Sequence, residues 1–197
     1  ITLKVYGDAN DYVGKGLSGA TIVVKPPTES NLTSQNNTII GNTVLYGATS
    51  GKLFASGQSG ERFAVRNSGA LAVIEGCDSN GCEYMTGGCV VILGKVGDNF
   101  GAGMTGGMAF VYDPIQEFVN YVNPESVVWQ IPQTDYWKNY LKSLINEHYK
   151  ETKSKIAQKI LLSFEKELKN FKQICPKEML NKLQNPLLLK QKILKVV

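Results

Sequence analysis

A repeat of about 18 residues constrains this fold more than any other feature of the sequence. Within residues 47–113, a small hydroxyl residue followed by glycine recurs at offsets of 18, 18 and 19 residues, at Ser50-Gly51, Ser68-Gly69, Thr86-Gly87 and Thr105-Gly106. Each pair leads into a short apolar run, such as ALAVIEG or GCVVILG, and an earlier copy precedes ATIVVK. A period this short is typical of a stacked, repetitive architecture.

Each repeat unit is long enough for one strand but too small to bury its own apolar face. If the units stack as coils, their strands pair in parallel and their inward side chains form a continuous apolar column. The units leave no room for a crossover helix, so the rest of each coil must connect successive strands. The repeat therefore predicts a right-handed parallel β-helix, because parallel crossovers are almost always right-handed. A sandwich or a propeller is the competing architecture, but a propeller blade needs about twice this period.

Composition divides the chain into two parts. All 20 glycines lie between Gly7 and Gly107. Lys and Arg minus Asp and Glu give 7 − 11 = −4 for residues 1–125 and 14 − 6 = +8 for residues 126–197. We therefore predict a β-helix domain over residues 1–122, followed by a connector and an α-helical C-terminal extension over residues 123–197. The lysines alternate with glutamates at helical spacing, which favours solvated faces of packed helices over a tail that binds nucleic acid or membranes.

The region after the glycines contains signals for short strands and helices. Residues 117–129 read as a connector with two candidate short strands, FVNYV and SVVWQI. Thr134 is expected to cap a helix along which an apolar stripe recurs at helical spacing: Trp137, Leu141, Leu144, Ile145 and His148. A second helix is expected to begin near Thr152 or Ser154 and to bury Ile156, Ile160, Phe164, Leu168 and Phe171. Pro176 should end it and start a short third helix, PKEMLNKL, and Asn185-Pro186 repeats that start signal before a Leu-rich tail. These helices are expected to cover the solenoid and cap its open end.

Two segments match the dinucleotide-binding pattern G-x-G-x-x-G, at residues 14–19 and 101–106. That motif binds a pyrophosphate only where it follows a strand and opens a helix. Here strand-like runs, ATIVVK and GMAFVYD, come next. We interpret these glycines as solenoid corners, and we expect Gly87 and Gly106 to occupy corners with positive φ.

Other residues that could carry chemistry form no convincing set. Cys77, Cys82 and Cys89 could be drawn as iron–sulfur ligands, but their spacing fits no ferredoxin pattern and favours packed or corner thiols. His148 is the only histidine and is expected at the packing edge of a helix. Turn-region acids are expected to cap backbone amides: Asp8, Asp11, Glu61, Glu75, Asp78, Glu83 and Asp98. We therefore assign no catalytic, cofactor-binding or metal-binding residue.

The expected cellular location follows from cysteine usage and from the absence of targeting or membrane-spanning segments in the sequence. Its four cysteines, including Cys175, do not form a dense disulfide framework, and the sequence has no signal peptide or 18-residue apolar span. A cytoplasmic or plastid-stroma protein is expected. The chain lacks an initiator methionine and opens directly on ITLKVY, which suggests a fragment or a processed product.

Three long segments resemble a known family. They are ANDYVGKGLSGATIVVKPP, IIGNTVLYGATSGKLFASGQSGERFAVRNSGALAVIEGC and GCEYMTGGCVVILGKVGDNFGAGMTGGMAFVYD. Together they are similar to the C-terminal Gly-x-Gly-x-Gly domain of the large subunit of glutamate synthase. The resemblance continues through LKSLINEHYKETKSKIAQKILLSFEKELKNFKQICPKEML, which looks like the terminal helical segment of that subunit. No match is found for the tail at residues 181–197.

The resemblance implies a right-handed β-helix with a structural role. The family enzyme makes glutamate from glutamine and 2-oxoglutarate, and uses FMN, a 3Fe-4S cluster and electrons from NAD(P)H or ferredoxin. Those cofactors belong to other domains, so none is expected in this chain. The implied partners are the glutamine amidotransferase and FMN synthase domains or subunits, with no nucleic acid and no membrane. An oligomer is compatible with this assembly.

Two functional hypotheses follow. The first is a non-catalytic interface domain of glutamate synthase that braces the two active domains for ammonia assimilation. The second is a free-standing β-helix enzyme or ligand-binding protein with its own groove site. A catalytic solenoid should show a cleft where ionisable groups of perturbed pKa converge, whereas a scaffold should expose apolar surface for partner domains.

Overall fold

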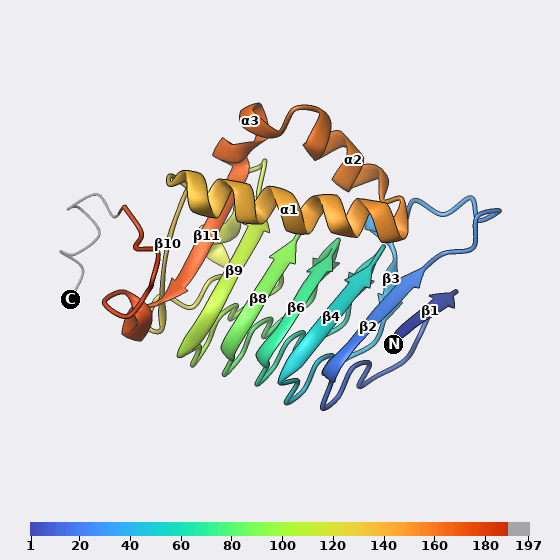
Figure 1. Cartoon of the computed structure of the whole chain (residues 1–197), viewed down its shortest axis with the longest axis horizontal. Coiled ribbons are helices and arrows are strands. Elements are labelled where there is room, and N and C mark those ends of the chain that lie inside the picture. The colour runs from blue at the N-terminus through green and yellow to red at the C-terminus, as the bar shows by residue number, and fades with distance from the viewer. Residues whose placement is uncertain (189–197) are drawn as a thin grey trace.

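The computed structural model describes residues 1–188 and shows a parallel β-solenoid with helices along one side (Figure 1). Its long sheet stacks six parallel strands in chain order: β1 (Thr2–Tyr6), β2 (Ser18–Lys25), β4 (Ser50–Ala55), β6 (Ser68–Ile74), β8 (Thr86–Ile92) and β9 (Gly106–Tyr112). A second parallel sheet consists of β3 (Thr38–Ile40), β5 (Gln58–Ser59) and β7 (Gly76–Cys77). The predicted β-helix is confirmed.

The corners of the solenoid have a regular backbone conformation that we did not predict. In five successive coils, φ is positive at three alternate residues: 12, 14 and 16; 43, 45 and 47; 62, 64 and 66; 80, 82 and 84; 99, 101 and 103. Amides in these corners hydrogen-bond to the neighbouring coil, as Ala64 does to the carbonyl of Val44 at 2.9 Å and Cys82 to that of Phe63 at 2.7 Å. Glycine fills the last two of these three positions in the first and last of these coils, but Arg62, Ala64 and Arg66 fill all three in the middle coil.

Gly87 and Gly106 are not positive-φ corners, and that prediction is wrong. Gly106 is the first residue of β9, and Gly87 is the second residue of β8. At both positions adjacent coils come very close together. A Cβ on Gly106 would lie 2.0 Å from the carbonyl oxygen of Thr86, and one on Gly87 would lie 2.2 Å from that of Ser68. These glycines are therefore required by close backbone approach.

The long sheet separates two hydrophobic clusters. The interior column of the solenoid includes Leu53, Ile74, Ile92 and Phe100, all buried. The outer face of the same sheet contributes Phe54, Val73, Val91 and Phe110 to a second cluster under the helices. Because successive residues of a strand face opposite sides, strands buried on both faces are nearly continuous in apolar residues, as in GCVVILG.

Helix α1 (Asp135–Thr152) crosses the outer face of the long sheet and contacts β2, β4, β6 and β8 (Figure 1). Thr134 caps it as predicted, accepting a hydrogen bond from the amide of Trp137 at 3.4 Å. The predicted stripe on this helix is buried against the sheet. Helix α2 (Lys155–Leu162) is capped by Ser154, whose hydroxyl accepts from the amide of Ala157 at 3.2 Å.

The second predicted helix is too long. The structure has α2, then the short α3 (Phe164–Glu167) and the 3₁₀ turn η3 (Leu168–Asn170), and Phe171 begins strand β11 (Phe171–Pro176). The prediction failed because Phe171 continues the helical spacing of Phe164 and Leu168. Strand β11 is antiparallel to β9 on one side and to β10 (Val127–Gln130) on the other. The C-terminal end of the long sheet is thus covered by strands, not by the helices that we expected.

The remaining predictions for the extension have mixed outcomes. SVVWQI contains β10 as predicted, but FVNYV forms the 3₁₀ turn η2 (Phe118–Asn120) instead of a strand. PKEMLNKL yields only one 3₁₀ turn, η4 (Lys177–Met179), and residues 186–188 are not helical. The turn η1 (Ser34–Asn36) lies in the polar loop after β2. The rest of the Leu-rich tail, from residue 189, lies outside the described residues.

Candidate functional site

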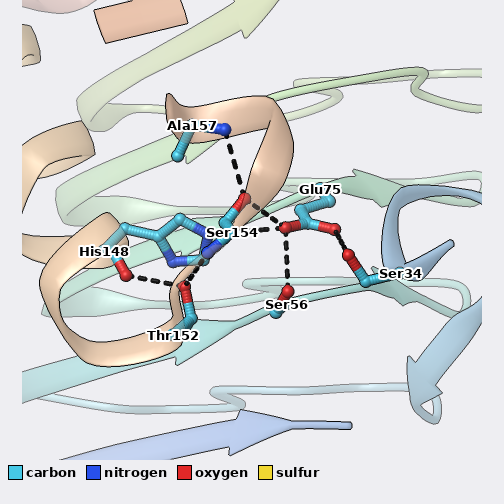
Figure 2. A network of polar contacts seen from close by, with 7 residues as sticks. All are labelled: Ser34, Ser56, Glu75, His148, Thr152, Ser154 and Ala157. Carbon is cyan, nitrogen blue, oxygen red and sulfur yellow. Dashed lines mark hydrogen bonds and ion pairs between the residues drawn. The ribbon is translucent and has the colours of Figure 1, made fainter. Parts of the chain in front are cut away.

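The carboxylate of Glu75 is the centre of the most extensive buried polar network in the described chain (Figure 2). Glu75 follows β6 and is only 1% exposed. The hydroxyl of Ser34 donates to its Oε2 at 2.8 Å, and that of Ser56 donates to its Oε1 at 3.0 Å. Ser154 donates a third hydrogen bond to Oε1. The three serines come from three separate segments, so one side chain ties the η1 loop, the end of β4 and the α1–α2 junction together.

His148 lies on the helical side of this network. Its side chain is fully buried, and its Nε2 is 3.8 Å from Oε1 of Glu75, too long for a hydrogen bond. Neither ring nitrogen has a hydrogen-bond partner among the described residues. Thr152 stabilises the end of α1. Its hydroxyl donates to the carbonyl of His148 at 2.6 Å and accepts from the amide of Ser154 at 3.2 Å. His148 is therefore buried at the centre of the interface, not at the packing edge that we expected.

The surroundings of Glu75 favour its ionised form. Burial alone raises the pKa of this carboxyl, but His148 and the hydroxyls of Ser154 and Ser34 outweigh burial and hold the pKa below its ordinary value of 4.5. Protonation would turn one acceptor site of this carboxylate into an O–H donor and would remove the negative charge that strengthens its three hydrogen bonds. At neutral pH the network therefore contains a buried, hydrogen-bonded anion.

This pKa shift predicts how stability depends on pH. Because the pKa of Glu75 is lower in the folded state, its contribution is fully present above about pH 4.5 and is lost as the pH falls through the lower, folded-state pKa. Urea unfolding of the wild type and of Glu75→Gln between about pH 3 and pH 7 tests this pH dependence, because the glutamine side chain at position 75 does not titrate in that range. The difference in unfolding free energy should shrink on the acid side. A difference that stays constant over this range would contradict the assignment.

A cavity of about 430 Å³ lies beside the network, at the ends of β8 and β9. Gln58, Glu75 and Lys95 are among its polar lining residues. Val96, Val111, Phe118 and Ile156 are among its apolar ones. Its size suits a small molecule or a short segment of polypeptide.

The residues considered as iron–sulfur ligands are buried thiols. Burial raises the pKa of Cys77, Cys89 and Cys175 to about 12, and that of Cys82 well above its ordinary value. Among residues 1–188 there is no group of three or more His, Cys, Asp or Glu side chains suited to hold a metal ion. The structure thus places Cys77 in β7, Cys89 in β8 and Cys82 in a solenoid corner, all buried.

The two G-x-G-x-x-G segments do not fit a cofactor phosphate. Residues 14–16 and 101–103 lie in solenoid corners with positive φ, and β2 and β9 follow them. A phosphate site of that type needs the amides of a helix N-terminus.

No described helix is both long enough and apolar enough to cross a membrane.

The acidic residues have three different roles. Asp11 accepts from the amide of Asn42 at 2.8 Å, and Asp78 accepts from that of Ser79 at 2.8 Å, which confirms turn capping at these two positions. Glu83 pairs with Arg62 at 3.1 Å across neighbouring coils. Glu75 contradicts the expectation, because it binds side-chain hydroxyls in the interior. The sequence signal that could have shown this is its position inside the apolar run ALAVIEGC.

Comparison with known proteins agrees with the fold. The sequence model of a family described as the GXGXG motif matches residues 1–177. This chain belongs to the GXGXG motif family. The G-x-G-x-G spacing of the family name is also the spacing of the positive-φ residues in each solenoid corner, for example 99, 101 and 103. The family match crosses residue 122, and our division of the chain at that residue stays a prediction.

Similar GXGXG sequences occur within glutamate synthases. The chain is 62% identical to the glutamate synthase [NADPH] large chain of Azospirillum brasilense over 94% of this chain and 12% of that protein. It is 50% identical to the glutamate synthase [NADH] of Schizosaccharomyces pombe over 90% of this chain and 8% of that protein. It is 51% identical to the ferredoxin-dependent glutamate synthase of Pyropia yezoensis over 89% of this chain and 11% of that protein. The chain thus spans about a tenth of the length of these curated relatives.

Proposed function

We propose that this chain is a non-catalytic structural and interface domain of a glutamate synthase. The observation that carries the proposal is sequence identity of 62% to a glutamate synthase large chain over nearly the whole of this chain. The relatives differ in the electron donor given in their names, NADPH, NADH or ferredoxin, yet all contain this region. A region shared by enzymes with different donors suits a role that does not depend on the donor.

In this proposal the solenoid braces the glutamine amidotransferase and FMN synthase domains. Stacked coils form a stiff body, because every strand pairs with its neighbours and two hydrophobic clusters fix the sheet from both sides. FMN and the 3Fe-4S cluster belong to the partner domains in this proposal, and the chain has no activity on its own. The proposed location is the cytoplasm or the plastid stroma.

A replacement experiment in the Azospirillum brasilense large chain tests this function. Exchanging the matching region for this chain should preserve glutamine-dependent glutamate synthesis, whereas deleting the region should abolish it. The isolated chain should neither hydrolyse glutamine nor reduce 2-oxoglutarate. Loss of activity in a folded, cofactor-loaded replacement would overturn the proposal. Turnover by the isolated chain would favour the alternative of an independent enzyme that uses the cavity beside Glu75.

A further inference from the structure

The second sheet of the solenoid stops one coil before the long sheet does. Beyond β7, the amide of Cys77 donates to the carbonyl of Lys95 at 3.0 Å, so residues 94–96 add one more row to the order β3–β5–β7. One coil later, residues 113–116 form a turn, in which the amide of Gln116 donates to the carbonyl of Asp113. Pro114 has no amide hydrogen, and the amide of Asp113 donates to the carbonyl of Asn170 at 2.7 Å. The next row of the second sheet is therefore missing from the described chain.

The row at residues 94–96 consequently has an open edge. In a parallel ladder, alternate residues direct their backbone groups to opposite neighbours. Lys95 faces β7, so Gly94 and Val96 face the side without a strand. The amides and carbonyls of Gly94 and Val96 make no hydrogen bond to another described residue. Such an edge is a template for an added strand.

The cavity of about 430 Å³ lies at this open edge and reaches the interior column. The inward positions of the second sheet run from Ile40 through Ser59 to Cys77, and Val96 continues them in the column. Val111 and Phe118, which also line the cavity, belong to the same column. One apolar side chain placed here would extend the column by another coil.

The rim of the cavity has surface that suits a polypeptide. Ile115 lines the cavity and is 57% exposed. The exposed Lys95 has no ion-pair partner among residues 1–188. Of the carboxylates that also line the cavity, Glu75 is bonded to serines and Asp113 lies 3.9 Å from Lys172, while Glu117 is exposed. An acidic residue directly opposite Lys95 on an added strand would form a favourable cross-strand pair.

We propose that residues 94–96 and the adjoining cavity bind an extended segment of a partner polypeptide, which adds the next parallel or antiparallel strand to the second sheet. The segment places an apolar side chain in the cavity and an acidic side chain opposite Lys95. This inference rests on the proposed function for the source of the segment, which is the rest of the glutamate synthase polypeptide. The docking chemistry itself depends only on the edge, the cavity and Lys95.

A labelled peptide tests the docking chemistry. The probe is a fluorescein-labelled peptide of about seven residues that alternates valine with threonine and carries one central glutamate. It should bind the full chain in fluorescence anisotropy and should slow hydrogen exchange at the amides of Gly94 and Val96. Replacing the valine nearest to this glutamate by proline should abolish binding, because proline lacks the amide hydrogen that pairs in a strand. The substitution Lys95→Glu should weaken binding about fivefold and should favour a peptide with lysine in place of glutamate.

The control variant is Lys169→Glu, which reverses another exposed lysine outside the cavity and should leave binding unchanged. Absence of binding overturns the proposal, as does binding that tolerates proline or that leaves residues 94–96 unprotected. These results are independent of the replacement experiment. Peptide binding together with a failed replacement would retain the docking site and reject the glutamate synthase assignment, and the reverse result would do the opposite.

Discussion

Replacing Gly106 by alanine is expected to destabilise the protein by about 3 kcal/mol or more, the upper part of the range for overpacked sites. The added Cβ would lie 2.0 Å from the carbonyl oxygen of Thr86 and 2.6 Å from its carbonyl carbon. Both atoms are backbone. The amides of Thr105 and Gly106 donate to the carbonyl of Met85 on one side of the contact, and β8 pairs with β9 from Met108 onward on the other. The neighbouring coils must therefore move apart, which breaks pairing along the ladder.

Gly16→Ala is the matched control for this prediction. Gly16 has φ of +66° and nothing within 4 Å of its virtual Cβ, so alanine there meets only the cost of a left-handed backbone, roughly 1–2 kcal/mol. Urea unfolding of the two variants separates close approach from backbone conformation. If Gly16→Ala is as damaging as Gly106→Ala, or more so, close approach of the coils is not the dominant constraint.

The repeat made the solenoid predictable, because each strand of the long sheet from β2 to β9 lies within one repeat unit and begins at the same pattern of a small hydroxyl residue followed by glycine. The corner conformation was not predictable residue by residue. Positive φ is expected for Gly14 and Gly16, but the same positions in another coil are Ala64 and Arg66. Hydrogen bonds to both neighbouring coils, such as that from the amide of Ala64 to Val44, hold these residues in a conformation that they would not adopt alone. Aligning the coils would have transferred the expectation from one to the other.

Strand β11 was missed for the opposite reason, because its partners are remote in sequence. Phe171 pairs with Tyr112, and Cys175 pairs with Val128. Within the local sequence, Phe171 completes a helical stripe with Phe164 and Leu168, so periodicity favoured a helix. Tertiary pairing with an open sheet edge outweighed that local preference.

The candidate site could not be assembled from the sequence either. Glu75 was predicted to cap backbone amides in a turn, whereas its partners in the structure are the hydroxyls of Ser34, Ser56 and Ser154, which lie in three different segments. No spacing rule connects them. The one sequence signal was the position of Glu75 inside an apolar run, because a charged side chain in a buried run almost always needs polar partners.

Replacing Glu75 by glutamine is expected to destabilise the protein by about 1.5–3 kcal/mol, the range for a hydrogen bond to a charged group. The amide keeps the size of the side chain but offers only one acceptor oxygen, while Ser34, Ser56 and Ser154 all donate. At least one buried hydroxyl then loses its acceptor, and His148 loses the adjacent negative charge. Urea unfolding at neutral pH measures the effect, with the exposed Glu165→Gln as the control that should change little.

A double-mutant cycle shows whether the network joins the helices to the solenoid. Ser154→Ala alone removes both the hydrogen bond to Glu75 and the cap on α2, and the cap is worth about 1 kcal/mol. If Glu75 and Ser154 act on one another, the double variant should be less destabilised than the sum of the single variants, by about 1 kcal/mol or more. Strict additivity would mean that Ser154 acts only as a helix cap. The attachment of α1 and α2 would then depend on the hydrophobic cluster beneath them and not on the buried carboxylate.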